Sequence, residues 1–262
     1  MGLGHLLALP AAAVAAYMTL LWGISLVKRD ASIVDAFWGP GFVVVAALYF
    51  VLGDGFEPRR ILVLALVTVW GLRLGAHILW RNWGRGEDRR YQAFRVKAGP
   101  SFWWRSYFTV FLLQGVLLWV ISMPLLAAQF SPEPAALVPT DVVGLALWLT
   151  GMVFEAGGDF QLARFRSDPR NRGRVLRAGL WGLTRHPNYF GDAVIWWAYF
   201  LLAAGTVVGA WTVFSPLMMT GLLLRVSGVR LLERSLVETK PEYREYTQST
   251  PAFFPRIPGW RR

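Results

Sequence analysis

The sequence contains no cysteine, which excludes disulfide bonds, thiolate metal sites and a catalytic thiol. Charge is also scarce, because Asp, Glu, Lys and Arg make up only 16% of the 262 residues, whereas soluble domains carry about 25%. None of the three histidines stands at metal-ligand spacing from another, so no metal site is expected. The GxGxxG, P-loop, HExxH and GxSxG motifs are missing as well. These absences argue against a soluble enzyme.

Long uncharged hydrophobic runs dominate instead. Hydrophobic residues make up 55% of the chain, and Leu6–Val27, Ala36–Gly53 and Ser106–Phe130 contain no Asp, Glu, Lys or Arg. A helix of about 20 apolar residues is long enough to cross a bilayer. The sequence therefore predicts an all-α integral membrane protein, whose first run is a retained span rather than a signal peptide.

The positions of Lys and Arg predict the topology. They gather after the first run, at 81–105, at 164–185 and from 225 onward, and they are sparse in the alternate loops. Such an excess in short loops marks the cytoplasmic side. We expect seven transmembrane helices, with the N-terminus outside and the C-terminus cytoplasmic, at about 6–27, 36–53, 61–80, 106–130, 142–163, 189–208 and 211–231.

The net charge of +11 follows from this topology and does not indicate a nucleic-acid partner. No obligate protein partner is evident either. Because the chain shows no internal repeat or linker, residues 1–262 are expected to form a single polytopic membrane domain.

Ionisable groups at membrane depth are costly, at roughly 2.5–3.5 kcal/mol each, and usually face a cavity or a partner. Here they gather at the cytoplasmic ends of the last three expected helices. Glu155 and Asp159 stand four residues apart, and Arg166 shares their face if that helix continues. Such a basic cleft with carboxylates suits a phosphorylated cofactor that carries hydroxyl groups. Alternatively, Glu155 and Asp159 lie at the solvated end of a transmembrane helix and bind no ligand.

A second basic feature is the run Arg170, Arg172, Arg174 and Arg177. We expect this run to attract lipid headgroups rather than to bind a ligand.

Four separated motifs resemble those of the steroid 5-alpha-reductase family, particularly its small bacterial branch. The segment 179–192 reads GLWGLTRHPNYFGD, with Pro187 near a helix start. The segments SIVDAFWG (32–39), GEDRRYQAFR (86–95) and LLERSL…KPEYREYTQSTPAFFP (231–255) also match. RHPxY alone is less specific, because membrane methyltransferases share it.

The resemblance implies a seven-helix fold that holds NADPH at the cytoplasmic side of its last three helices. Residues 1–130 (helices 1–4) would then form the substrate side, and 131–262 (helices 5–7 and the tail) the cofactor side. It implies cofactor-binding roles for Glu155, Asp159, Arg166, Arg185, His186, Asn188, Tyr189, Asp192, Arg230, Glu233 and Arg234.

The resemblance also implies an acid and a tyrosine that hold the carbonyl of a steroid. Asp35 matches the acid by position, and Tyr91 or Tyr189 is the candidate tyrosine. A carboxyl desolvated between helices has a raised pKa, so a protonated Asp35 is the expected hydrogen-bond donor.

The expected function is NADPH-dependent reduction of the C=C bond of an enone in a lipophilic, steroid-like substrate. The enzyme would sit in a bacterial inner membrane with its active site open to the cytoplasm. Two alternatives remain open. One is a membrane methyltransferase of the isoprenylcysteine or phospholipid type, which uses S-adenosylmethionine, and the other is a non-enzymatic lipid carrier.

Overall fold

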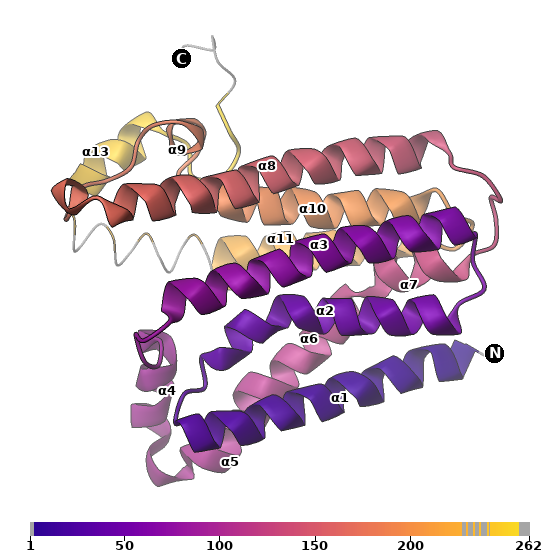
Figure 1. Ribbon diagram of the computed structural model, residues 1–262, viewed down its shortest axis with the longest axis horizontal. Coiled ribbons are helices and arrows are strands. Elements are labelled where there is room, and N and C mark those ends of the chain that lie inside the picture. The colour runs from indigo at the N-terminus through magenta and orange to yellow at the C-terminus, as the bar shows by residue number, and fades with distance from the viewer. Residues whose placement is uncertain are drawn as a thin grey trace. The chain divides into compact units, whose positions relative to one another are not determined.

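Helices make up the regular structure of the chain in the computed structural model, which describes residues 3–226, 229, 233, 236, 240 and 242–256 (Figure 1). The described residues contain no strand. The chain divides into two units, which are treated one at a time. Unit 1 comprises Met1–Val138 and Ala203–Thr212, and unit 2 comprises Pro139–Leu202 and Val213–Arg262.

Unit 1 contains three long helices, α1 (Leu3–Lys28), α2 (Ile33–Leu52) and α3 (Glu57–Asn82). They are followed by the short helix α4 (Arg89–Ala98), η1 (Gly99–Ser101) and α5 (Phe102–Ser106), then by a π-helical stretch η2 (Tyr107–Leu112), α6 (Leu113–Ile121) and α7 (Met123–Phe130). The expected helix over 106–130 is therefore interrupted. Pro124 lies in the first turn of α7, where it cannot donate a backbone hydrogen bond to the preceding turn.

Unit 2 begins with α8 (Pro139–Ser167), which is longer than expected and includes Arg166. After η3 (Pro169–Asn171) and α9 (Leu180–Leu183), α10 (Pro187–Ala204) starts at the proline of the RHPNY segment. The chain then forms η4 (Ala210–Val213), most of which belongs to unit 1. Unit 2 continues with α11 (Phe214–Gly221), the π-helical η5 (Leu222–Val226) and, near the end, α13 (Glu242–Ser249).

Five segments in the described part of the chain are long and apolar enough to cross a membrane, which marks it as an integral membrane protein. They are Gly4–Lys28, Ile33–Leu52, Glu57–Asn82, Arg89–Phe130 and Pro139–Ser167. These correspond to the first five expected spans. The sixth, α10, opens with the polar residues Asn188 and Asp192. The described part of the seventh includes α11 and η5, and its end lies largely outside the described residues. Seven spans and the orientation of the termini stay predictions.

Glycines allow α2 and α3 to approach closely in unit 1. A Cβ added to Gly71 would stand 2.6 Å from the backbone oxygen of Gly39, and one added to Gly75 would stand 2.8 Å from that of Ala36. Small residues are the usual means of close packing between membrane helices, because lipid offers no hydrophobic drive to helix association.

We expect Gly71→Ala to lower the free energy of unfolding by about 1–3 kcal/mol, because the new methyl group forces the two backbones apart. Gly23→Ala in α1 is the matched control, since a Cβ there meets nothing within 4 Å. That control is expected to be neutral or slightly stabilising. Unfolding of the purified variants in mixed detergent micelles measures both values, and equal effects would contradict the packing argument.

Candidate functional site

The first cluster of polar side chains joins the start of α2 to the start of α4 in unit 1. The Tyr91 hydroxyl donates to Asp35 Oδ1 at 2.6 Å, and Arg90 Nη2 donates to Asp35 Oδ2 at 2.8 Å. Gln114 Nε2 in turn donates to the Tyr91 oxygen at 3.2 Å. Tyr91 is buried, whereas 21% of the Asp35 side chain is exposed. These four residues are called the Asp35 cluster.

A second set of contacts fastens the loop before α4 to the turn between α1 and α2. The buried Glu87 carboxylate accepts two hydrogen bonds from Arg95 at 2.7 and 2.9 Å, and a third from the Ala31 backbone N–H at 2.8 Å. Burial raises the pKa of Glu87, but these hydrogen bonds outweigh it and leave the pKa below its ordinary value. The Asp88 backbone N–H also donates to the Ser32 hydroxyl at 3.2 Å. The start of α4, which carries Tyr91, is thereby fixed.

In unit 2, Glu233 joins two residues of the RHPNY segment. It accepts a hydrogen bond from Arg185 Nε at 2.7 Å, and His186 Nε2 lies 3.1 Å from the same oxygen. Burial raises the pKa of Glu233, yet the hydrogen bonds from His186 and Arg185 and the charge of Arg185 lower it to about 2. The predicted cofactor residues Arg185, His186 and Glu233 thus bind one another.

The C-terminal segment packs against the same residues. Arg185 Nη1 donates to the carbonyls of Thr247 and Thr250 at 2.9 and 2.6 Å, and its backbone N–H donates to Pro251. The Thr184 hydroxyl donates to Phe253 O at 2.9 Å. The two motifs at 179–192 and 231–255 therefore form one structure.

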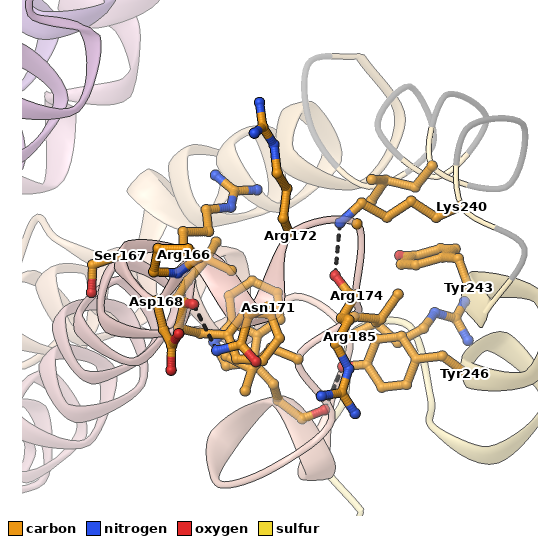
Figure 2. Close-up of a pocket in the computed structure, with 18 of the residues that line it drawn as sticks. Arg166, Ser167, Asp168, Asn171, Arg172, Arg174, Arg185, Lys240, Tyr243 and Tyr246 are labelled. Carbon is orange, nitrogen blue, oxygen red and sulfur yellow. Dashed lines mark hydrogen bonds between the residues drawn. The ribbon is translucent and has the colours of Figure 1, made fainter.

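A cavity of about 490 Å³ lies beside this structure, entirely within unit 2 (Figure 2). Its volume is within the range of small-molecule sites, which is roughly 300–1,000 Å³. Five basic side chains and four aromatic ones line it, together with His186: Arg166, Arg172, Arg174, Arg185 and Lys240, with Phe165, Trp181, Tyr243 and Tyr246. They come from the end of α8, the following loop, the RHPNY segment and the C-terminal part.

Crowding of positive charge is visible in Lys240. Burial, and then repulsion from Arg166, lowers the pKa of Lys240 despite the opposing charge of Glu242. Its ammonium group donates to the Arg174 carbonyl at 2.8 Å (Figure 2). An anion in the cavity would relieve this repulsion, so the arrangement favours phosphate or carboxylate ligands.

The remaining predicted cofactor residues lie between α8 and α10. Asn188 Nδ2 donates to the buried Asp159 at 3.1 Å, and the Tyr189 ring stacks on His186 with centroids 5.5 Å apart. Glu155 is buried beside Gly191, where an added Cβ would collide with its backbone. Asp192 follows on the same helix and is half-buried.

The structure thus separates the predicted site residues into two sets. Asp35 and Tyr91 meet in unit 1, whereas Tyr189, the other candidate tyrosine, belongs to unit 2. Arg230 and Arg234 lie outside the described residues.

Sequence reasoning missed several cavity residues, namely Arg172, Arg174, Lys240, Trp181, Tyr243 and Tyr246. The basic run at 170–177 was the available signal for Arg172 and Arg174, but the sequence analysis assigned this run to lipid headgroups rather than to a ligand site.

The depressed pKa of Glu233 predicts that the folded state loses stability in acid. A carboxyl with a folded-state pKa of about 2 and an ordinary value of 4.5 contributes stability above pH 4.5, which is lost as the pH falls toward 2. The thermal midpoint of the wild type should therefore exceed that of Glu233→Gln at neutral pH, and the two should converge in acid. A difference that does not change with pH would contradict this assignment. Melting curves in detergent across the pH range provide the measurement.

Comparison with known proteins gives the family. The DUF1295 family, described as a protein family of unknown function, matches residues 21–250. The chain belongs to the DUF1295 family. This DUF1295 member is 28% identical over 268 residues to an uncharacterized protein of Schizosaccharomyces pombe, with 92% of this chain and 77% of that protein covered.

Two further relatives have named activities. The Delta(14)-sterol reductase of Schizosaccharomyces pombe is 36% identical over 105 residues, which cover 34% of this chain and 24% of the reductase. The human 3-oxo-5-alpha-steroid 4-dehydrogenase 1 is 35% identical over 72 residues, which cover 28% of this chain and 27% of that enzyme. The DUF1295 chain is therefore distantly related to steroid and sterol reductases, and it spans about a quarter of their length. No solved structure matches it significantly.

Proposed function

We propose that this chain is a membrane-embedded reductase that uses NADPH to reduce the C=C bond of an enone in a lipophilic, steroid-like substrate. The cavity of unit 2 is the observation that carries the proposal. Its basic side chains suit the phosphates of a dinucleotide, and its aromatic rings suit the bases. The distant relation to steroid and sterol reductases supports the same reaction class.

The donor set of the cavity fits NADPH better than S-adenosylmethionine. NADPH carries a pyrophosphate and a 2′-phosphate, whereas S-adenosylmethionine carries a sulfonium cation and no phosphate. Arg166, Arg172, Arg174 and Lys240 would hold the phosphates, and Tyr243 and Tyr246 would lie against a ring. When bound, the reduced nicotinamide supplies a hydride to the β-carbon of the enone, and solvent supplies a proton to the α-carbon.

The Asp35 cluster would polarise the carbonyl of the substrate. As hydride arrives at the β-carbon, negative charge develops on the carbonyl oxygen, and a fixed donor nearby stabilises it. In the structure both Asp35 oxygens accept hydrogen bonds, one from Tyr91 and one from Arg90. This arrangement suits a carboxylate, so we assign the donor role to Tyr91 rather than to a protonated Asp35. Because the phenol has a single proton, its hydroxyl would turn from Asp35 to the carbonyl oxygen of the bound substrate, while Asp35 stays paired with Arg90.

The proposed setting is the cytoplasmic face of a bacterial inner membrane, because the basic loops would face the cytosol. The partners are a lipophilic enone, which enters from the bilayer, and the membrane lipids themselves.

Thermal stability of the detergent-purified protein tests the cofactor assignment. A ligand that binds only the folded state adds about 2.7 kcal/mol at 100 times its dissociation constant. NADPH is expected to raise the melting temperature, NADH to raise it less, and S-adenosylmethionine to leave it unchanged. A shift with S-adenosylmethionine alone would instead indicate a methyltransferase, and no shift with any of the three would favour a lipid carrier. Consumption of NADPH with an enone steroid then tests the reaction.

A further inference from the structure

We propose that α4 is an interfacial helix whose outer face binds the headgroups of anionic phospholipids. The orientation of α4 is the first observation that points to this face. Figure 1 shows α4 turned across the ends of α1 and α2 instead of running along them. At the end of α4, Gly99 adopts a positive φ of 57°, and the chain continues from there into η1 and α5.

The two faces of α4 differ in chemistry. Tyr91 and Arg95, four residues apart, face the inside of unit 1, where they bind Asp35 and Glu87. Val96, which is 84% exposed, lies on the opposite face, and Phe94, which is 53% exposed, lies at its edge, where its ring contacts that of Tyr91. Apolar surface of this extent on a helix at a bundle end is typical of a segment that lies in the headgroup region of a membrane.

Cations flank these apolar side chains. Arg89 and Lys97 are exposed on α4, and Arg85 is exposed in the preceding loop. Among the described residues none of these three has a carboxylate partner. The acidic residues of this region are engaged elsewhere, since Glu87 binds Arg95, and Asp88 binds Arg90. The outer face therefore carries uncompensated positive charge.

Exposed indole rings flank α4 on both sides in the sequence. Trp83 precedes it and is 83% exposed, while Trp103 and Trp104 follow it in α5 and are 58% and 44% exposed. Tryptophan is enriched at the membrane–water interface, where its ring sits at headgroup level. Cations alternating with exposed apolar and indole side chains match a layer of anionic headgroups above acyl chains, which is why a lipid surface is the occupant that we assign.

The absence of cysteine allows a direct test. Val96→Cys gives a single labelling site, and the full chain with a fluorophore there is reconstituted in phosphatidylcholine vesicles that contain phosphatidylglycerol. Quenching by nitroxide-labelled phosphatidylglycerol is compared with quenching by nitroxide-labelled phosphatidylcholine at the same mole fraction. We expect the anionic quencher to be about threefold more effective or better, because each cation near the surface attracts anionic lipid.

Two charge-matched variants test whether the cations of this face cause the preference for anionic lipid. Arg89→Gln with Lys97→Gln removes two cations of the outer face and should bring the ratio of the two quenchers close to one. Arg164→Gln with Arg244→Gln removes the same charge from exposed positions in unit 2 and should leave the ratio unchanged. Phosphatidylcholine quenching in each sample reports whether α4 still reaches the membrane, so a misfolded variant is recognised.

Three results would overturn the proposal. Equal quenching by the two lipids in the wild type would show no preference for anionic headgroups. An equal drop in both variants would show attraction by net charge rather than by this face. Quenching by neither lipid would place the face in water or beneath another protein.

Discussion

Replacement of Tyr91 by Phe is expected to lower the turnover number for an enone substrate by about 100-fold or more, with little change in NADPH affinity. Loss of one preorganised donor to a developing oxyanion typically costs about 10²–10³ in rate. The Phe ring keeps the packing of the buried Tyr91 side chain, and only the hydroxyl that joins Asp35 and Gln114 is lost. Turnover is measured from NADPH consumption, and affinity from a binding titration.

Asp35→Asn is expected to have a smaller effect in the same assay, because an amide oxygen can still accept the Tyr91 hydrogen bond. The loss then arises because Arg90, which pairs with both Asp35 and Asp88 in the wild type, keeps only Asp88 as a carboxylate partner. Tyr107→Phe serves as the control, since it removes a phenol of unit 1 whose oxygen lies 3.1 Å from the Thr19 hydroxyl. If Tyr91→Phe and Tyr107→Phe lose turnover equally, or if Tyr91→Phe weakens NADPH binding as much as turnover, the donor role is wrong.

The four sequence motifs combine in pairs, and sequence alone does not reveal this pairing. SIVDAFWG and GEDRRYQAFR meet through the contacts of Asp35 with Arg90 and Tyr91. The RHPNY segment and the C-terminal segment meet through Arg185, which reaches Glu233 and the carbonyls at 247 and 250. Periodicity gives the helices, but it does not say which segments, 48 to 65 residues apart in the chain, come together.

The number of spans shows where composition is a sufficient guide and where it is not. Long apolar runs predicted α1, α2 and α3 correctly, because the cost of charge in lipid dominates their composition, and Arg73 is the one charged residue in the third expected span. The run at 106–130 lies within the candidate span Arg89–Phe130, but the π-helical stretch at 107–112 and Pro124 interrupt its regular hydrogen bonding. Hydropathy does not register such breaks in the hydrogen-bonding pattern.

Charge was a poor guide to the part that each arginine plays. Arg185 was expected to bind a cofactor, and it does line the cavity, but its guanidinium group is largely taken up by Glu233 and backbone carbonyls. In the basic run, Arg170 and Arg177 pair with Asp168 and Glu245. Arg172 and Arg174, by contrast, line the cavity. The partner of an arginine depends on the tertiary structure, which the spacing of basic residues does not contain.

Arg174→Gln is therefore expected to raise the dissociation constant for NADPH by about 10- to 100-fold, and Arg172→Gln to act in the same direction. A hydrogen bond to a charged group contributes about 1.5–3 kcal/mol, which corresponds to that range of affinity. Glutamine preserves much of the side-chain length and removes the charge, so the measured loss reports the contact with phosphate. A fluorescence titration of the detergent-purified protein gives the constants.

Arg170→Gln is the matched control, because Arg170 belongs to the same loop, pairs with Asp168 and does not line the cavity. It is expected to leave the NADPH dissociation constant within twofold of the wild type, although it removes the same charge. Equal losses in Arg170→Gln and Arg174→Gln would show that the loop acts only through its overall charge. A larger loss for NADPH than for NADH in one cavity variant would assign that arginine to the 2′-phosphate, since the two cofactors differ only in that group.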